Sequence, residues 1–145
     1  MALCSSSGID GAILQLQKLG ALYSDKLPEE LLNEGADIVV EEWQKSADSH
    51  MVSHTGSLVN NIKKSNIKKA KGGGKMIAVY PRGSHPQKGK GKRKRNADVA
   101  FILNYSSRYP SQNGWIENAE MKAEPIVGAK WQEIADREIS KIGGE

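Results

Sequence analysis

Apolar residues in the first 50 positions recur at the three- and four-residue steps of α-helices. One such stretch covers residues 9–20, and its apolar stripe requires a packing partner. A second begins at Pro28, because proline lacks only an amide that is unpaired in a first helical turn, and we expect it to run to about Ser49. Its apolar face comprises Leu32, Ala36, Val39, Val40, Trp43 and Ala47, and its polar face Glu34, Asp37, Glu41 and Glu42. The pattern therefore predicts that this second helix is the central helix of the core.

The pattern changes after residue 50 to short elements. Gly56 ends the second helix, and the following hydroxyl residue can cap a short new turn, so that Leu58 and Ile62 face the core. Lysines then interleave with apolar residues up to position 70, three glycines at 72–74 supply permissive backbone, and residues 76–80 are β-prone. This order predicts a β-hairpin.

Residues 82–96 contain no side chain that could enter an apolar core. Nothing there offsets the entropy lost on ordering, so we expect a flexible basic loop that projects from the sheet.

Residues 97–105 are apolar again but too few for periodicity to assign, and we favour a strand or a mixed conformation over a short helix. Turn residues follow at 109–114, and apolar positions from Trp115 to Ile142 then mark a long helix, which Pro125 is expected to kink or divide. The fold class predicted is α+β, a single domain over residues 1–145. It combines two N-terminal helices, a small antiparallel sheet with a flexible basic loop, and a long C-terminal helix.

Composition restricts the class of protein. The hydrophobic fraction of 38% and charged fraction of 26% are typical of a soluble domain, and no apolar run approaches the roughly 20 residues that span a bilayer, so no membrane partner is expected. The N-terminal residues do not resemble a secretory signal, so the protein is expected to stay in the cytoplasm where it is made. Cys4 is the single cysteine, which rules out an intrachain disulfide and suits a reducing compartment.

The net charge of +4 is unevenly distributed. Residues 1–48 hold three Lys or Arg against nine Asp or Glu, and residues 98–145 hold five against eight. Residues 49–97 hold thirteen basic residues and no acidic one. The central third of the chain therefore either contacts a negatively charged partner or lies in solvent.

Residue types that could build a catalytic or metal site are scarce. His50 and His54 are spaced as two metal ligands on one helix face, but no carboxylate or cysteine follows up to residue 97 to complete a set. Glu41 and Glu42 are adjacent and so point to different sides of a helix, unlike a catalytic acid and base pair. We therefore expect no enzyme activity, no metal and no cofactor.

The densest basic run lies within the predicted loop. It consists of Lys88, Lys90, Lys92, Arg93, Lys94 and Arg95. Such clusters bind phosphate backbones without reading sequence, and no aromatic residue is interleaved for base stacking. Two interpretations stay open: nonspecific contact with DNA or another polyanion, and a solvated loop.

The order of motifs along the chain resembles a family of small tail-component proteins of long-tailed bacteriophages, also described as head-tail joining or tail-completion proteins. The residues that carry the resemblance are Gly35, Ala36, Thr55, Gly56, Leu58, Ile62, Tyr105, Trp115 and Ala119. The resemblance covers the chain from about Pro28 to the C-terminal helix. The family commonly has a glutamate-tyrosine-glycine sequence where this chain has Asn104-Tyr105-Ser106.

The resemblance implies a structural virion protein at the head-tail junction. Its copies would form a homo-oligomeric ring, expected to be a hexamer, between the head connector or adaptor and the tail-terminator or tube proteins, and the genome would pass through it. The alternative hypothesis is a small basic nucleic-acid-binding protein that uses residues 88–95 as its arm. A small hydrolase is a weaker alternative, because it needs a catalytic pair that the sequence does not provide.

Overall fold

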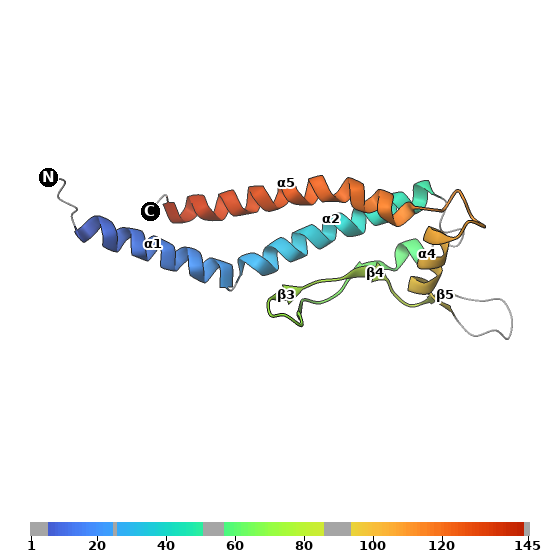
Figure 1. The fold of residues 1–145 in the computed structure, drawn as a ribbon, viewed down its shortest axis with the longest axis horizontal. Helices are drawn as coiled ribbons and strands as arrows, with labels where there is room; N and C mark the ends of the chain where they lie inside the picture. Colours follow the sequence, from blue (N-terminus) through green and yellow to red (C-terminus); the bar gives the residue numbers. More distant parts are fainter. Residues whose placement is uncertain (1–5, 25, 51–56, 86–93, 144–145) are drawn as a thin grey trace.

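The computed structural model describes residues 6–24, 26–50, 57–85 and 94–143 of the chain. Two long helices, α2 and α5, run side by side in opposite directions (Figure 1). Helix α1 precedes α2 and lies beside the C-terminal part of α5. Short antiparallel ribbons and helix α4 lie on the other side of α2 (Figure 1). The molecule is elongated (Figure 1). Its fold class is α+β, as the sequence predicts.

Helices α1 (Ser6–Ser24) and α2 (Leu27–Ser49) confirm the two N-terminal helices. Proline stands in the first turn of α2, together with Glu29 and Glu30, whose carboxylates suit the positive end of the helix dipole. One assignment of faces on α2 is wrong. Glu42 is buried rather than solvated, and its carboxylate lies 3.2 Å from the Lys45 ammonium group.

The predicted hairpin is confirmed as a ribbon of two paired stretches. After helix α3 (Ser57–Asn60), strand β1 (Ile62–Lys64) pairs with β4 (Val79–Pro81), and farther out β2 (Lys68–Lys69) pairs with β3 (Lys75–Met76). Both pairs are antiparallel. Gly73 and Gly74 close the tip with φ of 87° and 80°, a backbone region that glycine adopts at little cost.

The two ends of the basic segment 82–96 pair as strands, where the sequence predicts a flexible loop throughout. Strand β5 (Ser84–His85) pairs with β6 (Lys94–Arg95), and residues 86–93 lie outside the described part. Backbone pairing needs no apolar side chains. At the base of this ribbon the amide side chain of Asn96 is buried and donates to the Arg82 carbonyl at 2.6 Å.

Residues 97–105 are helical, so the preference for a strand is wrong. Helix α4 (Asn96–Tyr105) buries Asn96, Ala100 and Asn104, which recur at the four-residue step of a helix. Two of these are polar, and the large apolar residues of the segment, Phe101 and Ile102, are exposed. Val99 and Leu103 also pack against the core, but polar residues at two of the three most buried positions obscure the apolar periodicity of this face.

Helix α5 (Trp115–Gly143) is continuous through Pro125, so of the two expectations, a kink or a division, the division is wrong. Pro125 is exposed. The carbonyl that its missing amide leaves unpaired can therefore be hydrated.

The core lies where α2, α3, α4 and the start of α5 meet. Trp115 is fully buried and meets the half-buried Trp43 edge to face, with ring centroids 5.5 Å apart. The Ser46 hydroxyl donates to the Trp115 carbonyl at 2.6 Å, and the Trp115 indole donates to the Ala100 carbonyl at 3.3 Å. Trp131, farther along α5, is by contrast 40% exposed.

Gly35 sets the closest approach between α2 and α5. It is buried, and a Cβ atom added to it would lie 2.8 Å from Nε1 of Trp131, closer than real Cβ contacts allow. That same indole nitrogen donates to the Leu31 carbonyl at 2.7 Å. Glycine at this position is therefore needed for the indole to lie across α2.

We predict that Gly35→Ala destabilises the protein by about 1–3 kcal/mol, the usual cost of overpacking, although alanine is the better helix former. The measurement is the urea midpoint of purified variants. Gly128→Ala in α5 is the matched control, since nothing lies within 4 Å of the added carbon, and it should stabilise by about 0.5–1 kcal/mol. In a Trp131→Phe background the cost of Gly35→Ala should shrink. An equal gain at both glycines would contradict the packing described here.

Candidate assembly surfaces and basic ribbons

Most residues that carry the sequence resemblance lie in the core. Those buried are Gly35, Ala36, Leu58, Ile62, Trp115 and Ala119. Thr55 and Gly56 lie outside the described residues. Tyr105 differs from the rest because it is 59% exposed. The motif therefore maintains the fold at most of its positions and reaches the surface at Tyr105.

Asn104, the residue before this tyrosine, ties α4 to the start of α5. Its side-chain oxygen accepts from the Ile116 amide at 2.8 Å, and its side-chain nitrogen donates to the Glu117 carboxylate at 2.9 Å. Its backbone carbonyl accepts from the Gly114 amide at 2.9 Å. Asn104 thus satisfies an unpaired amide in the first turn of α5 from a distant part of the chain. Sequence analysis missed this role, because capping residues are sought next to the helix that they cap.

Tyr105 and Glu117 interact at the surface beside this cap. Desolvation acts to raise the pKa of Glu117, but hydrogen bonds from Asn104, from its own backbone amide and from Tyr105 together lower it. The hydrogen bond to Glu117 in turn raises the pKa of the Tyr105 hydroxyl. The two side chains form a local polar network.

Of the six basic residues singled out in the sequence, the structure describes two. Lys94 and Arg95 are exposed on β6, and the Arg95 guanidinium contacts both carboxylate oxygens of Asp98 at 3.1 Å. Lys88, Lys90, Lys92 and Arg93 lie outside the described residues. The charge of Arg95 is thus partly offset within its own chain.

Helices α1, α4 and α5 expose large apolar side chains; those on α5 (Met121, Ile126, Trp131 and Ile139) are spaced along its length, whereas those on α1 and α4 are close together in sequence. On α1 these are Ile13, Leu14 and Leu16, the last 67% exposed, and on α4 they are Phe101, Ile102 and Tyr105, with Phe101 61% exposed. The rings of Phe101 and Tyr105 touch, with centroids 4.6 Å apart. We call these sets the α1 surface and the α4 surface. They lie toward opposite ends of the molecule (Figure 1).

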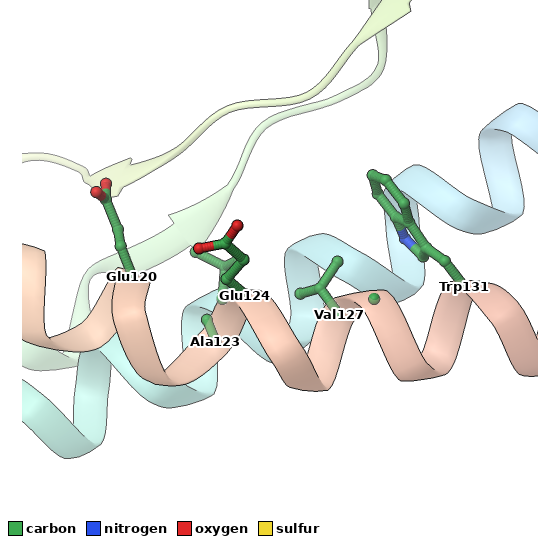
Figure 2. Close-up of a pocket in the computed structure, with 7 residues that line it drawn as sticks. Glu120, Ala123, Glu124, Val127 and Trp131 are labelled. Atoms are coloured by element: carbon green, nitrogen blue, oxygen red, sulfur yellow. The ribbon is translucent and has the colours of Figure 1, made fainter.

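An apolar groove of about 490 Å³ runs between α2 and α5. Its lining residues are Val39, Glu120, Ala123, Glu124, Val127, Gly128 and Trp131. Figure 2 shows Glu120 and Glu124 at one end and the Trp131 indole at the other, all directed to the same side of α5. This lining offers two carboxylates and an indole, and it contains no histidine, thiol or hydroxyl side chain.

The other candidate chemistry of the sequence finds little support. Among the residues that the structure describes, no three His, Cys, Asp or Glu side chains gather as metal ligands would. His54 lies outside the described residues, and Nδ1 of His50 is 2.8 Å from the Ser46 carbonyl. No helix in the described part of the chain is both long and apolar enough to span a membrane.

Comparison with known families places the chain among the tail components of bacteriophages. Residues 10–105 match the family described as "Bacteriophage HK97-gp10, putative tail-component", and the chain belongs to this family. The match extends from α1 through α4, so it includes the motif residues from Gly35 to Tyr105. Trp115 and Ala119 lie beyond it, on α5. The family resemblance read from the sequence is confirmed, and it identifies a structural protein of the phage virion.

The comparisons with curated proteins and with solved structures gave no match.

We predict that Glu117→Gln reduces the loss of stability at low pH. A carboxylate whose pKa is lowered by folding contributes stability above its unfolded pKa, and this is lost as pH falls through the folded pKa. The affected window therefore lies below about pH 4.3, the ordinary glutamate pKa. Urea midpoints from pH 2 to 7 measure it.

Glu124→Gln, on the same helix, controls for the removed charge. If both variants showed the same acid profile as the parent chain, the network of Tyr105, Asn104 and Glu117 would not contribute to stability.

Proposed function

We propose that this tail component is a structural, noncatalytic subunit of a ring at the head-tail junction, and that the ring joins the head connector or adaptor to the tail-terminator or tube proteins while the genome passes through it. The observation that carries the proposal is the pair of apolar surfaces on α1 and α4. A soluble chain gains nothing from leaving so many large apolar side chains in water, and such patches mark protein contacts.

The arrangement of these surfaces favours head-to-tail contacts between copies. A head-to-tail contact joins two different surfaces of the same chain, and a ring forms when the rotation closes. The α1 and α4 surfaces are different in composition and lie toward opposite ends of the subunit (Figure 1). We therefore propose that the α1 surface of one copy packs on the α4 surface of the next, in a ring expected to hold six copies.

We further propose that the basic segment from Lys88 to Arg95 faces the DNA that passes through the ring. Clustered cations raise the free energy of a ring, because each added copy repeats the charge, and DNA phosphates would relieve this repulsion. Contact through exposed side chains would be weak and sensitive to salt, which suits a genome that must move.

The runner-up is a nucleic-acid-binding protein that acts outside the particle through residues 88–95. The basic central third of the chain favours it, whereas membership of a tail-component family favours the structural role. The location of the protein in purified particles separates the two.

We predict that the protein occupies the head-tail junction of the mature particle. Cryo-electron microscopy of purified virions, combined with an antibody against the chain, should place density for it between connector and tail. Particles made without the gene should contain separate heads and tails. A protein found free in the lysate or elsewhere on the tail would contradict the junction role.

We predict that charged substitutions on either apolar surface block ring formation, and that mixing restores a single contact. Leu16→Glu disables the α1 surface and Phe101→Glu the α4 surface, so a mixture retains one functional pair and should yield dimers but no rings. Sedimentation velocity, with the purified head connector present as template, measures the distribution. Met121→Glu, at an exposed site on α5, is the control and should assemble normally. Rings formed by either single variant would refute the proposed contact.

A further inference from the structure

The tip of the β2–β3 hairpin carries a second group of cations, outside the basic run at residues 88–95. Lys68 and Lys69 form strand β2, Lys71 lies in the turn, and Lys75 begins β3. All of them are exposed, and no acidic residue occurs anywhere from Ser49 to Ala97 to balance them locally.

Ion pairs with α2 divide the hairpin lysines into two sets. The Lys64 ammonium lies 2.8 Å from the Asp37 carboxylate, and that of Lys75 lies 2.6 Å from the Glu29 carboxylate. These two contacts hold the ribbon against α2. In the described part of the chain, Lys68, Lys69 and Lys71 make no ion pair or side-chain hydrogen bond. Among the described residues, these three outermost cations therefore have no compensating partner.

The geometry of the tip distributes these charges on both faces of a narrow ribbon. Neighbouring positions in a strand point to opposite faces, so Lys68 and Lys69 project to opposite sides, and Lys71 lies near the end. Gly72, Gly73 and Gly74 follow without side chains, so nothing bulky blocks close approach at the extremity. The width of a two-stranded ribbon matches the major groove of B-form DNA, where phosphates line both walls.

We propose that the β2–β3 tip inserts into a groove of double-stranded DNA, with Lys68, Lys69 and Lys71 contacting phosphates on both walls. This inference rests on the proposed DNA-passing role for its place in the particle. Lysine contacts to phosphate read no sequence, so the tip binds any duplex. The paired lysines, Lys64 and Lys75, hold the ribbon in position rather than bind.

An acidic protein surface is the competing partner. A protein surface would meet one face of the ribbon and leave cations on the other face unpaired. Cations on opposite faces instead match the two phosphate walls of a groove, which favours DNA.

The test measures binding of the full chain to a 20-base-pair duplex by fluorescence anisotropy, from 50 to 300 mM salt. The triple variant Lys68→Gln, Lys69→Gln, Lys71→Gln should bind at least about tenfold more weakly near 0.1 M salt, and its slope of log affinity against log salt should flatten by about 2.7, or 0.9 for each lost phosphate contact. The control carries the same loss of charge at other exposed sites: Lys26→Gln, Arg108→Gln, Lys122→Gln. Its slope should match that of the parent chain.

Three results would overturn the proposal. Equal losses in the two triple variants would mean that net charge alone matters. Displacement of the duplex by polyglutamate at equal charge would identify an acidic protein partner. Tighter binding to single-stranded DNA would exclude insertion into a groove. The three lysines are exposed, so we expect the triple variant to fold normally. A urea midpoint equal to that of the parent chain shows that weaker binding does not result from unfolding.

The result is separable from the junction role. Duplex binding is measured on purified protein, so a steep salt slope that depends on the hairpin would stand even if the protein were absent from the junction. A variant with residues 88–95 neutralised, measured in parallel, assigns the remaining slope to the other basic segment.

Discussion

The packing of α2 against α5 is the contact on which the rest of the structure depends. At one end the indole of Trp131 lies across Gly35 and donates to the Leu31 carbonyl. At the other end Trp43 meets Trp115, which Ser46 also holds by a hydrogen bond. Because α2 and α5 contact each other at both ends, they form a rigid antiparallel pair. The hairpin and α4 are positioned by their contacts with this pair. A subunit built in this way can be long without a large core.

The sequence predicted the elements whose buried faces are apolar and missed those whose buried faces are polar. The spacing of α2 and the glycine-centred hairpin were recognised because side-chain hydrophobicity reports their burial. Helix α4 was not, since it buries Asn96, Ala100 and Asn104. The side chains of Asn96 and Asn104 each make one hydrogen bond to the backbone of another segment, which no local pattern contains, although the side-chain oxygen of Asn96 has no partner among the described residues.

The sequence predicted where the basic residues of the candidate site lie, but not which of them form ion pairs. Counting residues located the basic third of the chain. The count could not show that Lys64 and Lys75 are neutralised by α2, because their acidic partners lie far away in sequence. It also drew attention to the dense run near residue 90 and away from Lys68, Lys69 and Lys71, which have no ion pair among the described residues. Local density of charge is a poor guide to net charge once a chain is folded.

The distribution of unsatisfied groups explains why so small a chain can have two kinds of partner. Its acidic side chains lie mainly on the helices, where many already pair with lysine or arginine, as Glu30 does with Arg137 across the α2–α5 contact. The hairpin tip carries three lysines that have no ion pair among the described residues, and the α1 and α4 surfaces carry exposed apolar residues that are close together in sequence. Apolar surfaces are stabilised by contact with protein at any salt concentration, whereas exposed lysines bind polyanions with a strength that salt reduces. In the ring that we propose, each copy would therefore hold its neighbours firmly while contacting the passing DNA loosely, because the two interactions use different side chains and respond differently to salt.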